Sequence, residues 1–200
     1  MERQVIVAKS AGFCFGVQRA VDSVYKELEE NSGKIYTFGP IIHNEQVVED
    51  LNKRGIEVID TVEQLKEIKE GTVVIRSHGV AKEIYDILEQ QKLKMVDATC
   101  PFVLKIHRIV EEESAKGKQI IIIGNEKHPE VEGIMGWSHS PVLVIDTVEK
   151  AKNMQLDNKK EVVIVSQTTF NYNKFKELVE IIDEKGYNIT IKNTICNATE

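Results

Sequence analysis

DATCPFVLK, residues Asp97 to Lys105, places a cysteine between a short apolar run and a helical pattern. The run that leads into it, KMVDA, is typical of a strand, and the following FVLKIHRIVEEESAKG repeats apolar residues every three or four positions before a glycine. Cys14 and Cys196 lie at similar junctions. Because strands that alternate with helices form parallel sheets covered on both faces, the sequence predicts an α/β fold.

The same alternation extends along the chain. Two more helical patterns begin at Val17 and Asn171, and we expect their helices to end at Gly33 and Gly186. Short β-branched runs between the helices indicate strands that connect through βαβ units. These runs begin at Val5, Ile35, Ile56, Thr72, Lys94, Gln119, Val142, Glu161 and Asn188.

Composition narrows the class of protein. Of the 200 residues, 42% are hydrophobic and 29% are charged, which is typical of a globular protein with a buried core. The net charge of −6 carries no basic stripe, so we do not expect nucleic acid as a partner. No apolar run is long enough for a membrane span or a signal peptide. We therefore expect a cytoplasmic protein with no membrane partner and with reduced thiols.

A weak internal repeat indicates how the chain is divided. The matching separations are 29 residues from Cys14 to His43, 28 from Cys100 to His128, 64 from Cys14 to His78 and 68 from Cys100 to Thr168. We expect two related α/β lobes at 1–98 and 99–193, and the start of a truncated third lobe at 194–200. The run Val5 to Ala8 could pair with the first lobe or with the third.

Three thiols at equivalent junctions suggest one metal centre. If the lobes pack around an approximate threefold axis, Cys14, Cys100 and Cys196 would point to its centre. The sequence has no C-x-x-C pair, which disfavours both a structural zinc site and the ferredoxin pattern. Three separate thiolates could hold a four-iron, four-sulfur cluster and leave one iron free to act as a Lewis acid. Each cysteine taken alone could equally be an inert buried thiol.

Other polar residues follow strands and could bind a substrate. Protonated imidazoles of His43, His78 and His128, together with loop N–H groups, could hold a phosphate. Glu130 could donate a proton if burial raises its pKa, and we prefer it to Glu132 because it is nearer to His128.

The remaining motifs have simpler interpretations. We expect one of Thr168 and Thr169 to cap the next helix, while the other could relay a proton. His107 and His139 are assigned to a helix flank and a turn. GFCFG matches neither a phosphate loop nor a dinucleotide fingerprint, so we do not expect an ATPase or a dinucleotide enzyme.

Taken together, the motifs resemble the family of LytB-type 4-hydroxy-3-methylbut-2-enyl diphosphate reductases, iron-sulfur enzymes of the last step of the non-mevalonate isoprenoid pathway. In chain order they are AGFCFGVQRAV, IIHN, SHGV, DATCP, HPEVEGIMG, SQTT and TICNAT. The resemblance covers the whole chain. It implies a pseudo-threefold α/β trefoil around one 4Fe-4S cluster.

The resemblance also implies a reaction. An allylic diphosphate would lose its hydroxyl as water, take up two electrons and two protons, and yield isopentenyl and dimethylallyl diphosphate, with ferredoxin or flavodoxin as the electron donor. By motif, the cluster ligands would be Cys14, Cys100 and Cys196. The diphosphate would be bound by His43, His78 and His128. Glu130 would be the proton donor, and Thr168 would position the hydroxyl and relay protons. The family takes further diphosphate contacts from a third lobe, so we expect these 200 residues alone to be a poor catalyst.

Three alternatives stay open on sequence grounds. A vestigial relative would keep the fold without turnover, although the retained Glu130 and histidines speak against it. A structural zinc module would bind zinc through the thiols and a histidine. A plain α/β binding protein would carry inert cysteines and need no metal.

Overall fold

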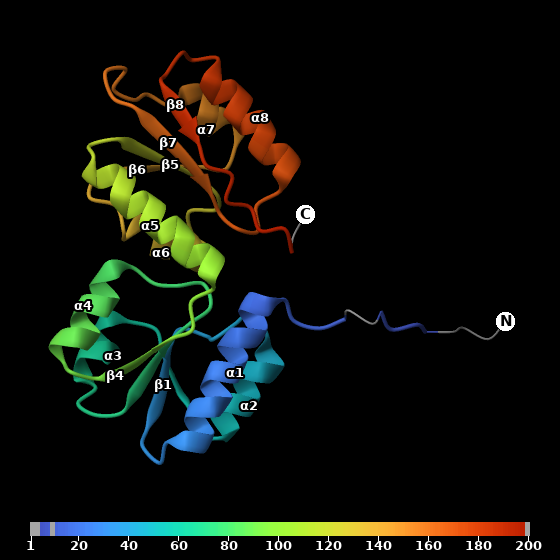
Figure 1. The fold of residues 1–200 in the computed structure, drawn as a ribbon, viewed down its shortest axis with the longest axis vertical. Helices are drawn as coiled ribbons and strands as arrows, with labels where there is room; N and C mark the ends of the chain where they lie inside the picture. The colour runs from blue at the N-terminus through green and yellow to red at the C-terminus, as the bar shows by residue number, and fades with distance from the viewer. Residues whose placement is uncertain (1–4, 9–10, 199–200) are drawn as a thin grey trace.

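The computed structural model describes residues 5–8 and 11–198 and contains two four-stranded parallel sheets, each in its own lobe (Figure 1). The first lobe consists of α1 (Phe15–Glu30), β1 (Ile35–Phe38), α2 (Glu45–Lys53), β2 (Glu57–Ile59), α3 (Val62–Glu67), β3 (Thr72–Ile75), α4 (Lys82–Gln90) and β4 (Lys94–Asp97). The second lobe consists of α5 (Pro101–Ala115), β5 (Gln119–Ile123), α6 (Pro129–Met135), β6 (Val142–Ile145), α7 (Val148–Asn153), β7 (Val162–Ser166), α8 (Tyr172–Asp183) and β8 (Ile189–Ile191). The expected α/β fold is confirmed.

The two sheets share one topology. Their strand orders are β2-β1-β3-β4 and β6-β5-β7-β8, and every neighbouring pair is parallel. Each strand and helix of the first lobe therefore corresponds to the element numbered four higher in the second, so that β1 matches β5 and α1 matches α5. This equivalence confirms the repeat that the cysteine and histidine spacing predicted.

Each sheet is buried on both faces. The side chains of β1, β3 and β7 are buried along their whole length, as expected for parallel strands between helices. In the first lobe, α1 and α2 cover one face and α3 and α4 the other, while α5 and α6 lie opposite α7 and α8 in the second. Because helices cover both faces of each sheet, functional groups are expected at the ends of the strands.

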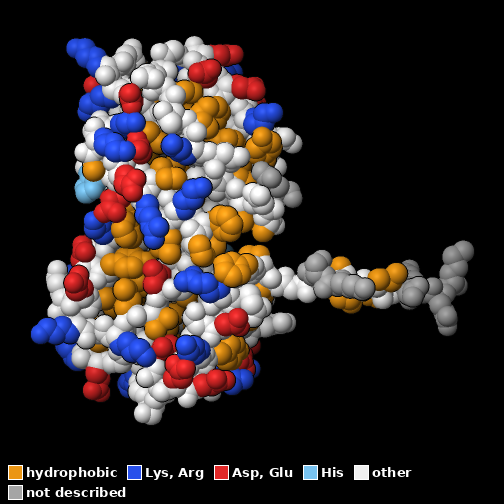
Figure 2. All heavy atoms as spheres, in the orientation of Figure 1, with side chains coloured by type: hydrophobic (Ala, Val, Ile, Leu, Met, Phe, Trp, Pro, Cys, Tyr) orange, Lys and Arg blue, Asp and Glu red, His pale blue; other side chains and the backbone are white. Residues whose placement is uncertain are grey.

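The run Val5 to Ala8 is not a strand. It joins neither sheet, and the side chains of Val5, Ile6 and Val7 are 88%, 81% and 75% exposed. Figures 1 and 2 show residues 5–8 away from both lobes, with hydrophobic side chains in the open. Pairing with the first lobe is therefore wrong, whereas pairing with a third lobe stays a prediction, because an apolar run forms a strand only where a partner edge supplies its hydrogen bonds.

The first helix ends earlier than predicted. It stops at Glu30, and the backbone N–H of Asn31 donates to the carbonyl of Glu27 at 3.0 Å. Gly33 therefore lies in the loop. Gly186 also lies three residues after its helix, but both Gly117 and Gly186 adopt the left-handed conformation typical of a helix stop, with φ values of +81° and +76°.

The two lobes meet where α6 packs against the loop between β3 and α4. The approach is close, since a Cβ added to Gly136 would lie 2.2 Å from the Cβ of Ala81. The indole N–H of Trp137 donates to the carbonyl of Val80 at 2.9 Å. His107, expected on a helix flank, lies on α5 but is buried here and stacks on Trp137 with the ring centroids 5.0 Å apart. No helix in the described part of the chain is long and apolar enough to cross a membrane.

Candidate active site

One pocket collects the cysteines and part of the predicted polar set at the carboxyl ends of the strands. Its volume is about 110 Å³. The polar and thiol side chains that line it include Cys14, Cys100, Cys196, His78, Glu130 and Thr168. Of these, Cys100, His78, Thr168 and Cys196 follow β4, β3, β7 and β8, so parallel strands bring them to the same side of their sheets.

Two of the thiols lie at the starts of helices. Cys14 and Cys100 are the N-cap residues of α1 and α5, whereas Cys196 follows β8. A Cβ on Gly16 would lie 2.5 Å from the Sγ of Cys100, so only glycine lets α1 come this near. The backbone N–H of Cys196 donates to the carbonyl of Thr168 at 2.8 Å.

The pocket fits the implied iron-sulfur cluster. Three soft thiol donors converge on it, and Val17, Phe102 and Val103 add an apolar lining that limits the access of water. Burial raises the pKa of the Cys100 thiol, although the backbone N–H groups of Phe102 and Val103 oppose this. Cluster binding would therefore have to release the Cys100 proton.

Glu130 and Thr168 form a buried pair between α6 and the end of β7. The backbone N–H of Thr168 donates to Oε1 of Glu130 at 2.6 Å, and its hydroxyl donates to Oε2 at 2.7 Å. Burial raises the pKa of Glu130, and the two hydrogen bonds only partly oppose it. The carboxyl group is 2% exposed and can hold a proton beside the thiols, whereas Glu132 is exposed.

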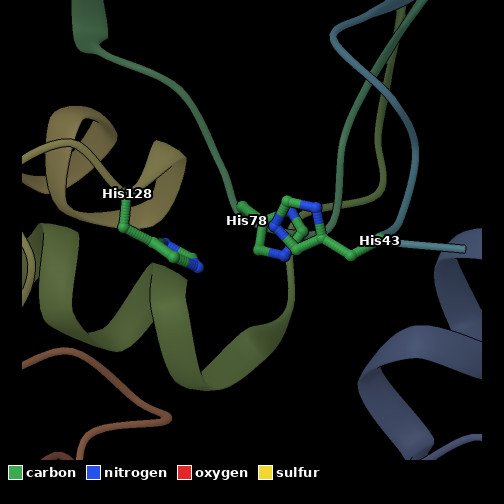
Figure 3. A group of neighbouring side chains, drawn as sticks. All are labelled: His43, His78 and His128. Atoms are coloured by element: carbon green, nitrogen blue, oxygen red, sulfur yellow. The ribbon is translucent and has the colours of Figure 1, made fainter.

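The three histidines form a cluster beside this pocket (Figure 3). Ring centroids lie 4.3 Å apart for His43 and His78, and 5.6 Å from each of these to His128. Ring nitrogens from all three lie within 4.8 Å of one another. The histidine loops follow β1, β3 and β5, so the cluster draws on both lobes.

His78 and His128 are suited to donating hydrogen bonds while uncharged. Burial, then the neighbouring imidazoles of His43 and His128, lower the pKa of His78 to about 3. Nδ1 of His128 accepts the backbone N–H of Glu130 at 3.1 Å, which places the proton of the neutral ring on Nε2. Burial and neighbouring charges lower the pKa of both His78 and His128, so the expected protonation of these two imidazoles is not favoured in the ligand-free protein. Nδ1 of His78 is buried and has no hydrogen-bond partner among the described residues, so a bound anion could provide one.

Sequence reasoning missed two arginines. The side chain of Arg76 lies against Gly39, and its Nε donates to the carbonyl of Gly79 at 3.3 Å, between the loops of His43 and His78. The positive charge of Arg76 contributes to the lowered pKa of His78 and His128. Arg19 contacts the loop before Cys100. The sequence did contain one sign of Arg76, because it lies two residues before the candidate ligand His78. Nothing in the sequence indicated that Arg19 would contact the Cys100 loop.

The expected threonine cap is wrong. The N-cap of α8 is Asn171, whose side chain accepts the backbone N–H of Lys174 at 2.9 Å. Thr168 bonds to Glu130 instead, and the hydroxyl of Thr169 accepts a hydrogen bond from Gln167 at 3.0 Å. His139 lies, as assigned, in the bend between α6 and β6.

Comparisons with known proteins decide the family. The family model described as LytB protein matches residues 5–200. The chain belongs to the LytB family. A LytB relative from Caldanaerobacter subterraneus subsp. tengcongensis, named 4-hydroxy-3-methylbut-2-enyl diphosphate reductase, is 42% identical over 198 residues. A relative of the same name from Alkaliphilus oremlandii is 46% identical over 198 residues, so this is a family of oxidoreductase enzymes.

Solved LytB structures have the same fold. The reductase from Plasmodium falciparum matches with a TM-score of 0.88 and 28% identity over 96% of this chain. A second structure, titled as the terminal enzyme of the non-mevalonate pathway, matches with a TM-score of 0.80 and 41% identity over 97% of this chain. The chain spans 60% and 68% of those two proteins, and 68% and 69% of the two curated relatives.

Proposed function

We propose that this chain carries the cluster-binding and proton-donating residues of a 4-hydroxy-3-methylbut-2-enyl diphosphate reductase. The single observation that carries the proposal is the pocket in which three cysteines meet the buried Glu130–Thr168 pair. Relatives that bear this name support the assignment. The reaction removes the allylic hydroxyl as water and consumes two electrons and two protons, and its products are isopentenyl and dimethylallyl diphosphate.

The thiols would hold the cofactor. Cys14, Cys100 and Cys196 would ligate three irons of one 4Fe-4S cluster. When bound, such a cluster supplies electrons and a Lewis-acidic iron without a protein ligand. The electrons would come from a protein donor of the ferredoxin or flavodoxin type.

The rest of the pocket would bind the substrate and deliver protons. His43, His78 and His128 would donate N–H groups to the diphosphate. Glu130 would hold a proton on its buried carboxyl group, and the Thr168 hydroxyl would pass it towards the leaving hydroxyl. Val17, Phe102 and Val103 would keep bulk water away from the thiols.

Anaerobic iron and sulfide analysis with a visible spectrum tests the proposal. It is made on this chain and on a version extended to the length of the relatives, after reconstitution with iron and sulfide. We expect about four irons in the extended protein and broad visible absorption. Replacement of each cysteine in turn by serine should abolish both, whereas replacement of the exposed His139 by alanine should not.

The opposite result is equally clear. A colourless protein that contains zinc and no iron would replace the reductase by a structural metal module. A protein that binds neither metal, and is as stable without them, would indicate inert cysteines.

A further inference from the structure

Arg19 connects the segments that carry two of the proposed cluster ligands. It is the fifth residue of α1, the helix that Cys14 caps. Its Nη1 donates to the carbonyl of Thr99 at 2.7 Å, and its Nη2 donates to the carbonyl of Asp97 at 3.1 Å. The Asp97 carbonyl ends β4, and the Thr99 carbonyl belongs to the short loop between β4 and Cys100. One guanidinium therefore ties the first cysteine segment to the second.

We propose that Arg19 is a positioning residue that fixes Cys100 relative to Cys14. That the separation of Cys14 and Cys100 matters for catalysis rests on the proposed function. The contacts themselves belong to the chain without any cofactor, so they can be tested without one.

The loop before Cys100 depends on this donor. Thr99 is 0% exposed, so its carbonyl has little access to water if Arg19 is removed. A buried carbonyl without a hydrogen-bond donor costs free energy of folding. The planar guanidinium of arginine can donate to two carbonyls two residues apart, which suits this site better than the single ammonium group of lysine. Removal of the guanidinium should therefore let the loop rearrange.

The opposite side of the loop is held separately. The backbone N–H of Cys100 donates to the carbonyl of Ser77 at 2.9 Å. The side chain of Asp97 accepts the backbone N–H of Thr99 at 2.9 Å. These contacts link the loop to β3 and to itself, and neither reaches α1. Arg19 thus provides a hydrogen-bonded link to the helix of Cys14.

Arg19 is not needed to attach α1 to the lobe. Ala20, Val21 and Val24 on the same helix are buried at 0%, 6% and 0% exposure and pack in the core of the first lobe. We therefore expect a substitution at Arg19 to change the cysteine geometry while the helix stays in place.

The repeat provides a matched control. Lys105 lies five residues after Cys100, as Arg19 lies five residues after Cys14, and it is exposed on α5. Lys105→Met removes one positive charge from an equivalent helical position without removing a hydrogen bond to the Cys100 loop.

Thiol crosslinking in the metal-free chain tests the inference. Cys196→Ser leaves Cys14 and Cys100 as the two thiols, and a short bifunctional reagent then reports their proximity. The reagent first alkylates one thiol and then reacts with the second. We expect Arg19→Met to slow this second step about tenfold relative to the first, because a tenfold change matches the loss of a charge-assisted hydrogen bond. Arg19→Lys should fall between Met and the parent, and Lys105→Met should crosslink like the parent.

A second readout separates geometry from general stability. In the extended protein with all three cysteines, Arg19→Lys should alter the electron paramagnetic resonance spectrum after reconstitution and reduction and should speed the release of iron to a chelator, while the variant stays folded at the assay temperature. Crosslinking at the parental rate in both folded Arg19 variants overturns the inference. So does an equal slowing in Lys105→Met. An extended protein that has all three cysteines and binds no iron contradicts the proposed function instead, and the crosslinking result still decides the role of Arg19.

Discussion

At the scale of the residue, the buried Glu130 carboxyl group is the proton donor that we propose for the pocket. Glu130→Gln keeps the size of the side chain and removes the exchangeable acid proton. We expect kcat to fall roughly 10²- to 10⁴-fold, the usual contribution of a general acid, with a much smaller change in KM. Glu132→Gln, two residues along the same helix but exposed, should leave kcat unchanged.

The raised pKa of Glu130 also sets a pH limit. If Glu130 donates the proton as proposed, its protonated form is the active one, so activity should be present below the raised pKa and decline as pH rises through it. The Gln variant should lack this decline. Steady-state rates from pH 5 to pH 9 would show it, and a parental pH limit retained in Glu130→Gln would assign the decline to another group.

Arg76 places a positive charge next to His78 and His128, whose pKa values are both lowered. If the cluster receives a diphosphate, Arg76→Met should weaken the binding of inorganic diphosphate about tenfold, as for loss of an interaction with a charged group. Isothermal titration calorimetry measures this, and the effect should shrink at high salt. Arg108→Met, on the exposed side of α5, is the matched control. Equal affinities in the two variants would show that Arg76 only supports its loops.

At the scale of the element, the packing of α6 against the β3–α4 loop brings His128 and Glu130 towards His78. Gly136→Ala places a Cβ 2.2 Å from that of Ala81, so one segment must shift. We expect a loss of about 1–3 kcal/mol in the free energy of unfolding, typical of overpacking. The same change at Gly33, where a Cβ meets nothing within 4 Å, should be tolerated. Denaturant unfolding of both variants checks this.

The elements differ in how readily the sequence predicts them. β-branched runs located the strands that pair, because burial on both faces demands continuous apolar residues. The repeat spacing also placed His43 and His128 at equivalent strand ends. The missed features depend on contacts between distant segments: the unpaired run at Val5, the burial of His107 and the reach of Arg19. Periodicity shows which face of an element is apolar, but not what lies against it.

At the scale of the whole molecule, a buried histidine at the contact between the lobes should control stability in acid. Both ring nitrogens of His107 are buried without hydrogen-bond partners in the described part of the chain. Burial lowers its pKa to about 4 from the ordinary 6.5, while the Asp97 carboxylate partly opposes the shift. The folded protein therefore keeps this ring neutral while the unfolded chain takes up a proton. Stability should be complete above pH 6.5 and fall as pH drops towards 4.

His107→Phe should remove that dependence. The phenyl ring can keep the stack on Trp137 and has no nitrogen to protonate. A shift from 6.5 to about 4 corresponds to roughly 3 kcal/mol at pH 4, so the variant should gain about that much over the parent there and little at pH 7.5. His78, whose pKa is also lowered, leaves a residual acid slope in both proteins. Urea unfolding from pH 4 to pH 7.5, with the exposed His139→Phe as control, measures the difference. Parallel pH curves for His107→Phe and the parent would mean that the lobes open and hydrate His107 before the rest of the protein unfolds.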